Sequence, residues 1–276
     1  MGDHIRDERI ELEGRKYFYR DWGDTGAPPI VLLHGFTGHA RSWDTIARKL
    51  APTHRVIAFD QRGHGLSDWA NDYSTTAMVE DVRMLVDALG FERFQLLGLS
   101  MGGRVAFHFT GAYPERVTRL VLVDIAPEID RAGVQRIQEG TRQQDVFATA
   151  EEALAQSAKA NPIAPAGELE HRVRNNLMLQ DDGTWTFRYD RGLRNGERPL
   201  DRPPAEDGWA ACRAIAAPTL FIRGAQSDLI TPELAERMGS EIPDCSVVEV
   251  DPSGHSVPLD NPDGFATAVL PFVNAG

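Results

Sequence analysis

Short apolar runs that do not alternate with polar residues are the feature of this sequence that most limits its fold. "IVLLH", "RLVLVD" and "TLFIRG" are apolar at nearly every position. This pattern is typical of strands buried on both faces, as in a parallel sheet covered by helices. Strands are therefore predicted at residues 16–20, 30–34, 56–60, 94–98, 120–124, 219–224 and 246–250.

Helical patterns lie between these runs. "TTAMVEDVRMLVDALG" places its apolar residues on one helical face, and a glycine ends the pattern. "TPELAERMGSEI" begins with Thr231 and Pro232, which suit the N-cap and the first helical position. Regular alternation of strands and helices predicts an α/β fold with a doubly wound, mostly parallel sheet.

The stretch 126–207 interrupts this alternation. It lacks a convincing buried strand, and "EEALAQSAKAN" and "ELEHRVRNNLMLQ" have helical periodicity. The following "DDGTWTFRYDRGLRNGERPLDRPP" is typical of a loop or hairpin. We predict a core formed by residues 1–125 and 208–276, with 126–207 inserted as a mainly helical cap.

The segment "LGLSMGG" carries a G-x-S-x-G motif centred on Ser100. It directly follows a predicted buried strand and directly precedes a predicted helix, which is the context of a nucleophile elbow. Gly98 and Gly102 lack the Cβ atoms that would collide in such a sharp turn. We therefore expect Ser100 to be exposed at the carboxyl edge of the sheet as a nucleophile.

A serine nucleophile needs a base and an acid that orients the base. His255, in "DPSGHSVPLDNP", follows the last predicted strand and is the candidate base. Two residues are candidates for the acid, because Asp124 ends one predicted strand and Asp228 follows another. The backbone amides of Phe36, in "LLHGF", and Met101 are predicted to form an oxyanion hole.

Together these segments resemble the α/β-hydrolase fold family over nearly the whole chain. "LLHGF", "DQRGHGLSD", "LGLSMGG", "PERVTRLVLVD", "TLFIRG" and "SGHSVPLDNP" occur in the family's order. The resemblance implies hydrolysis through an acyl-enzyme. The sequence departs from the family's Gly-x-x-Asp pattern, since Ser227 stands at the acid's place and Asp228 one residue later.

Some esterase-like members with a similar "VDIAP" segment also have serine at this place and use the aspartate that ends the previous strand. That comparison favours Asp124 and leaves Asp228 open. The core segments and the cap are also similar to bacterial hydrolases that open an acetamidomethylene-succinate. This second resemblance implies a small acyl substrate.

The composition limits the partners. The net charge of −12 argues against nucleic-acid binding. No window approaches 18 apolar residues and the first residues lack an apolar signal-peptide core, so we expect no membrane association and a cytoplasmic location. The sequence shows no HExxH motif or other metal-binding pattern, and we expect no metal and no cofactor. A small acyl substrate is the expected partner, with the chain a monomer or homodimer.

The predicted cap has a locally positive stretch. Residues 171–198 hold six arginines (172, 174, 188, 191, 194 and 198) against four acidic residues. An arginine there could bind a substrate carboxylate through a bidentate pair. The candidate substrate-binding residues are Trp43, Met178, Trp185, Phe187 and Arg188.

We thus predict a serine hydrolase that cleaves a small carboxylic ester. Several alternatives would use the same triad: a carbon–carbon bond hydrolase of a dienoic diketone acid, a lactonase, an amide-bond hydrolase and a cofactor-free perhydrolase. A ligand receptor with a residual triad is the alternative that is not an enzyme. A haloalkane dehalogenase or epoxide hydrolase is disfavoured, because both need an aspartate where Ser100 stands.

Overall fold

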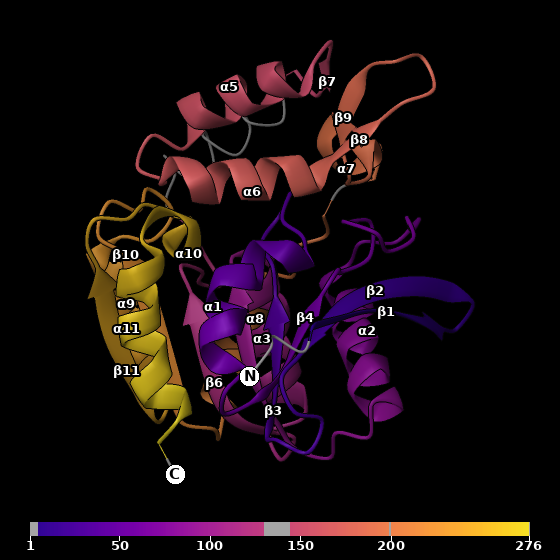
Figure 1. The fold of residues 1–276 in the computed structure, drawn as a ribbon. Helices are drawn as coiled ribbons and strands as arrows, with labels where there is room; N and C mark the ends of the chain where they lie inside the picture. Colours follow the sequence, from indigo (N-terminus) through magenta and orange to yellow (C-terminus); the bar gives the residue numbers. More distant parts are fainter. Residues whose placement is uncertain (1–4, 130–143, 199, 276) are drawn as a thin grey trace.

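An eight-stranded sheet forms the centre of the computed structural model, which describes residues 5–129, 144–198 and 200–275 (Figure 1). The strand order is β1-β2-β4-β3-β5-β6-β10-β11. β2 pairs antiparallel with β1 and with β4, and the other pairs are parallel. This confirms the predicted α/β fold. The strands are β1 (Ile5–Leu12), β2 (Arg15–Trp22), β3 (Pro29–Leu33), β4 (Arg55–Phe59), β5 (Phe94–Leu99), β6 (Val117–Val123), β10 (Thr219–Gly224) and β11 (Cys245–Val250).

Helices cover both faces of the sheet, and each face buries its own apolar cluster. Along β3, Val31 and Leu33 belong to one cluster, whereas Ile30 and Leu32 belong to the other. This period of two explains why the strands are apolar at every position. The first cluster takes in α2 (Thr75–Ala88), α3 (Met101–Ala112), α8 (Ala205–Arg213) and α9 (Pro232–Glu241), and the second takes in α1 (Asp44–Leu50) and α11 (Pro262–Val273).

The strand β1 was not among the predicted strands. Its sequence "IRDERIEL" is rich in charged residues, and most of its side chains are exposed or half-buried. β1 lies at the edge of the sheet and pairs only with β2. An edge strand of this kind lacks the continuous apolar pattern of the central strands, which is why the pattern did not reveal it.

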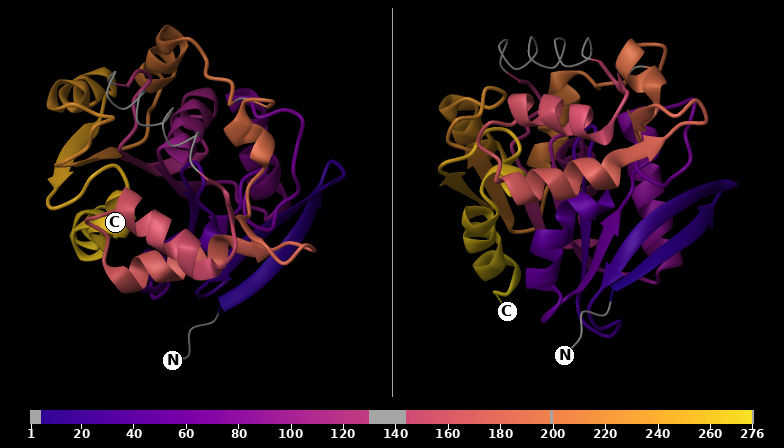
Figure 2. Two further views of the ribbon diagram at one scale, coloured as in Figure 1. Left: turned by 90° about the horizontal axis from the view of Figure 1, so that it is seen from above. Right: turned by 45° about the horizontal axis from the view of Figure 1, so that its top comes forward.

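Residues 144–198, which we call the cap segment, lie above the sheet (Figure 1). They form α5 (Ala150–Ala160), α6 (Ala166–Asn176) and α7 (Arg191–Asn195). They also form a small sheet in the order β7-β9-β8, built from β7 (Val146–Phe147), β8 (Leu177–Leu179) and β9 (Trp185–Phe187). β8 and β9 pair as an antiparallel hairpin, but only β9 lies in the segment predicted as a loop or hairpin, because β8 takes up the end of the stretch "ELEHRVRNNLMLQ" that was predicted to be helical. Figure 2 shows α5 and α6 side by side across the top of the core.

Cys212 and Cys245 are free thiols, and Cys212, on α8, is buried in the first apolar cluster. Within residues 5–129, 144–198 and 200–275, no helix combines the length and the hydropathy needed to cross a membrane.

One turn of α6 joins the cap segment to the core. Thr45 donates its hydroxyl to Glu168 at 2.8 Å. His171 Nε2 lies 3.0 Å from Asp44 Oδ2, and the ring of His39 donates from Nε2 to the backbone carbonyl of Arg172, also at 3.0 Å. The core partners in these contacts all lie at the start of α1 or at the 3₁₀ turn η1 (Ala40–Trp43) before it. The contacts therefore fix α6 relative to the carboxyl edge of the sheet.

The His171–Asp44 contact makes a testable contribution to stability. The hydrogen bond to Asp44 raises the pKa of His171 above its ordinary value of 6.5. A raised pKa in the folded state stabilises the protein below pH 6.5, and the contribution disappears as the pH rises through the folded pKa. We expect His171→Gln to lower the melting temperature at about pH 5.5, with the difference from wild type largely lost by about pH 9.

Thermal unfolding of both proteins across this pH range checks the prediction. Arg174→Gln is a suitable control, because Arg174 lies on the exposed side of the same helix and pairs with Glu170. The difference in melting temperature between Arg174→Gln and wild type should not become smaller as the pH rises. A His171→Gln difference that stays constant with pH would argue against a charged His171.

Candidate active site

Ser100 stands between β5 and α3 in a strained backbone conformation. Its φ is +53°, a left-handed value that costs a serine energy. The flanking glycines make the turn possible: a Cβ at Gly98 would lie 2.4 Å from the carbonyl oxygen of Gly102. A Cβ at Gly102 would lie 2.2 Å from the carbonyl oxygen of Leu33 in β3. The geometry is that expected of a nucleophile elbow.

The close approach at Gly102 predicts a large stability effect. In Gly102→Ala, the added methyl group would have to displace the backbone of β3, since the contact is to a carbonyl and not to a flexible side chain. We expect a loss of about 3 kcal/mol or more in the free energy of unfolding, measured by denaturant titration. Gly167→Ala is the matched control, because no atom lies within 4 Å of the position that its added methyl group would take. It should stay within about 0.5 kcal/mol of wild type.

Positive φ values gather at the loops around Ser100. In the described chain, the non-glycine residues with positive φ are Glu13, Thr37, Ser100 and Asp124. Glu13 lies in the β1–β2 turn, but the other three follow the ends of β3, β5 and β6. These strands are neighbours in the sheet. Backbone strain concentrated at one place is typical of functional sites.

His255 and Asp124 are in direct contact. Nδ1 of His255 lies 2.7 Å from Oδ2 of Asp124, whose side chain is fully buried, while the His255 side chain is 16% exposed. The backbone amide of Ser100 donates to Val123, the residue before Asp124. The segments of all three residues therefore converge at the carboxyl ends of β5 and β6.

The candidate acids differ in their relation to His255. Asp124 holds the ring nitrogen that the acid of a triad must contact, whereas Asp228 lies in the loop after β10. Asp124 also accepts hydrogen bonds from the backbone amide of Gly224 at 3.1 Å and from the hydroxyl of Ser227 at 2.6 Å. In the sequence, Ser227 is only a departure from the Gly-x-x-Asp pattern, and nothing in that pattern predicts its hydrogen bond to Asp124.

The loop after β3 lies against Ser100. A Cβ built at Gly35 would lie 3.3 Å from Cβ of Ser100. In the described part of the chain, the backbone amides of Phe36 and Met101 donate to no protein acceptor. His34 supports the loop: its Nδ1 contacts the carbonyl of Gly35 at 2.8 Å, and its Nε2 accepts from the backbone amide of Gln61. These contacts are consistent with a structural His34.

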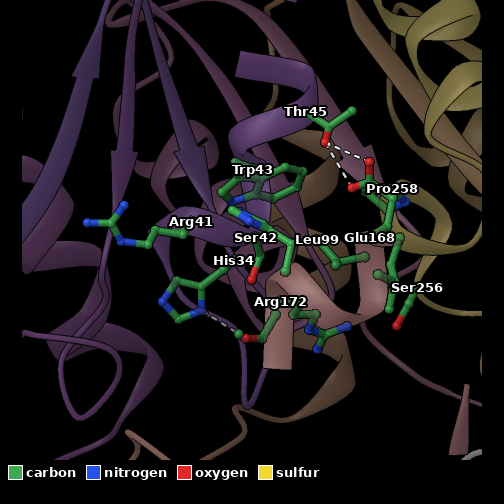
Figure 3. A pocket seen from close by; sticks show the side chains of 14 residues that line it. His34, Arg41, Ser42, Trp43, Thr45, Leu99, Glu168, Arg172, Ser256 and Pro258 are labelled. Carbon is green, nitrogen blue, oxygen red and sulfur yellow. Dashed lines mark hydrogen bonds between the residues drawn. The ribbon is translucent and has the colours of Figure 1, made fainter. Parts of the chain in front are cut away.

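A pocket opens beside these residues (Figure 3). Gly35, Leu99 and Ser256 line it, and they are the chain neighbours of Phe36, Ser100 and His255. The rest of the wall comes from the loop after β3, from η1 and α1, from α6 and from the short α10 (Val257–Asp260). Of the predicted substrate-binding residues, the buried Trp43 lines this pocket. Figure 3 shows its indole among the side chains around the cavity.

The other predicted substrate-binding residues lie in the cap segment. Phe187 lines a second pocket, which also includes Thr37 and Tyr189. Met178 and Trp185 line neither of these two pockets. Arg188 lines neither, and its Nε donates to the carbonyl of Leu177 at 2.9 Å. Sequence position in the cap could not separate these residues, because the pocket wall depends on how the cap elements pack against each other and against the core.

Comparison with known proteins identifies the family. Residues 28–262 match the model of the alpha/beta hydrolase fold family. The chain is an α/β hydrolase. The sheet order and the strand–Ser100–helix turn described above agree with that assignment.

Relatives of this α/β hydrolase carry hydrolase names. It is 32% identical to a 3-hydroxybutyrate-oligomer hydrolase of Cupriavidus necator, over 93% of this chain and 92% of the relative. It is 27% identical to the esterase YbfF of Escherichia coli, over 89% and 93% of the two chains. The crystal structure of an E-2-(acetamidomethylene)succinate hydrolase superposes with a TM-score of 0.89, covering 99% of this chain and 100% of the other at 24% identity. That likeness shows the shared fold.

Proposed function

We propose that this α/β hydrolase is a serine esterase that cleaves small carboxylic esters through an acyl-enzyme. Ser100 is the nucleophile, His255 the general base and Asp124 the acid of the triad. The backbone amides of Phe36 and Met101 form the oxyanion hole. The pocket lined by Gly35, Leu99 and Ser256 receives the substrate.

The observation that carries the proposal is the 2.7 Å contact between His255 Nδ1 and the buried carboxylate of Asp124. A carboxylate at Nδ1 fixes the tautomer in which Nε2 can accept a proton, and it stabilises the imidazolium that then forms. Gly224 and Ser227 donate hydrogen bonds to the same carboxylate, and these hold it in position.

The reaction follows from these roles. Oγ of Ser100 attacks the ester carbonyl carbon while Nε2 of His255 takes its proton. The tetrahedral intermediate places its negative oxygen at the amides of Phe36 and Met101, close to the amino end of α3. Its collapse breaks the bond to the alcohol, which leaves with the proton from His255. A water molecule then repeats the sequence on the acyl-enzyme and releases the acid.

The relatives support an ester over the other acyl compounds. The names of the relatives in Cupriavidus necator and Escherichia coli are those of an oligomer hydrolase and an esterase. A 3-hydroxybutyrate oligomer is joined by ester bonds, so both names describe ester cleavage. The triad alone would serve a lactone, an amide or a carbon–carbon bond equally well.

Pre-steady-state kinetics test the proposal. We expect 4-nitrophenyl esters to give a burst of 4-nitrophenol equal in amount to the enzyme, because the acyl-enzyme forms faster than it is hydrolysed. The same protein should be assayed with lactones, amides and dienoic diketone acids, and for peroxide-dependent halogenation. If kcat/KM for one of these alternative reactions exceeds kcat/KM for every ester tested, that reaction replaces ester hydrolysis as the proposed function. Tight ligand binding without turnover would instead favour the receptor alternative.

A further inference from the structure

Arg172 brings a positive charge to the proposed catalytic pocket. It lies on α6 and lines both the pocket beside Ser100 and the second pocket in the cap segment. In the view of Figure 3, its guanidinium lies among the lining side chains on the side of Ser256. Its backbone carbonyl is held by His39, so the start of the side chain is fixed relative to η1.

The other ionisable side chains of this pocket have protein partners. Arg41 pairs with Asp7 at 2.5 Å, Glu168 accepts the hydroxyl of Thr45, and His171 contacts Asp44. In the part of the chain that the structure describes, the guanidinium of Arg172 has no hydrogen bond or ion pair with a protein group. Among the ionisable residues of this pocket, it is therefore the one available to a ligand.

Burial makes this charge costly. It lowers the pKa of Arg172, and the negative charge of Asp260 opposes the shift. Asp260 is itself engaged, because its Oδ2 accepts the backbone amide of Gly254 at 2.9 Å. A guanidinium stays protonated in proteins, so a desolvated one gains most from an anion that accepts two parallel hydrogen bonds.

We infer that Arg172 binds a carboxylate of the substrate, so that the preferred esters carry a free carboxylate on the side of the cavity facing α6. This inference rests on the proposed esterase function and narrows its substrate class. The reacting carbonyl would lie between Ser100 and the amide of Phe36, while the carboxylate would lie at the cap side of the same pocket. The planar fork of arginine suits a carboxylate better than a lysine ammonium would.

Matched substrates test the inference. Mono-4-nitrophenyl adipate and 4-nitrophenyl methyl adipate have the same chain and leaving group, and differ in whether the far end is a carboxylate or a neutral methyl ester. We expect wild type to have a kcat/KM at least about 10-fold higher for the acid, as a charge-assisted hydrogen bond provides. Arg172→Gln should lower kcat/KM for the acid by about 10- to 100-fold and leave that for the methyl ester within about twofold.

Arg174→Gln is the control variant. Arg174 is two residues away on the same helix, but it is exposed and pairs with Glu170 at 2.7 Å. The substitution should leave the preference for the acid unchanged. Thermal unfolding of Arg172→Gln, together with its activity on the methyl ester, shows that the variant is folded.

The outcomes separate the two proposals. If wild type hydrolyses both adipates and Arg172→Gln leaves their ratio of kcat/KM unchanged, the role of Arg172 is refuted while the esterase remains. Equal loss on both substrates in a folded variant also refutes it. If wild type hydrolyses neither these esters nor the wider ester panel, the proposed esterase function itself fails.

Discussion

Replacing Ser100 by alanine should lower kcat for 4-nitrophenyl ester hydrolysis by at least about 10⁴-fold, because the nucleophile of the acyl-enzyme is lost. The effect should fall on kcat and abolish the burst of 4-nitrophenol. Any remaining rate above that in water would come from substrate binding and the oxyanion hole. Steady-state kinetics and the burst amplitude, measured on the same preparations, check both expectations.

The fold should survive this substitution. Alanine can occupy the turn at φ +53° with a strain similar to that of serine, and the hydrogen bond from the Ser100 amide to Val123 is a backbone contact. We therefore expect a melting temperature close to that of wild type. An alanine variant that is folded and keeps most of the wild-type activity would falsify the serine mechanism.

The acid of the triad is the second prediction with a large effect. Asp124→Asn should lower kcat by about 10⁴-fold, because an amide at His255 Nδ1 allows the tautomer that cannot accept the proton of Ser100. Asp228→Asn should change kcat by no more than about threefold, because Asp124 holds Nδ1 at 2.7 Å. The two variants differ from wild type by the same chemical change, so each is the control of the other.

Side-by-side measurement of kcat and of thermal unfolding decides between the acids. Asp124 also accepts hydrogen bonds from Gly224 and Ser227, so Asp124→Asn is expected to melt at a somewhat lower temperature than wild type. Its activity should be measured well below that temperature. If Asp228→Asn instead lost more kcat than Asp124→Asn, Asp228 would be the acid of the triad.

Much of the core could be predicted because its strands are buried on both faces. The predicted run 219–224 coincides with β10. Thr231 is the N-cap of α9, as predicted: its hydroxyl accepts a hydrogen bond from the backbone amide of Leu234, and Pro232 is the first residue of the helix. The edge strand β1 escaped prediction because five of its eight residues are charged. The strands β7, β8 and β9 have only two or three residues, which is too few for a period to be recognised.

The site residues also differ in how far the sequence could predict them. The role of Ser100 could be predicted from the local sequence, because the turn around it requires glycine at positions 98 and 102. The choice of Asp124 depends on which strand end His255 reaches, and this is a tertiary property. The pocket wall was harder still. Arg172 is one of six arginines in its stretch, and sequence alone cannot show which of them lacks a protein partner.

The hydrogen bond between Ser227 and Asp124 joins residues 103 positions apart, from loops after the adjacent strands β6 and β10. Each could hold the carboxylate that steadies the same imidazole. An evolving lineage could therefore transfer the negative charge from one strand end to the next by exchanging the residues at these two positions, a displacement of about one hydrogen-bond length. The histidine would keep a carboxylate throughout such an exchange if the second were gained before the first was lost. The position of the acid in the chain can thus change without any change of reaction.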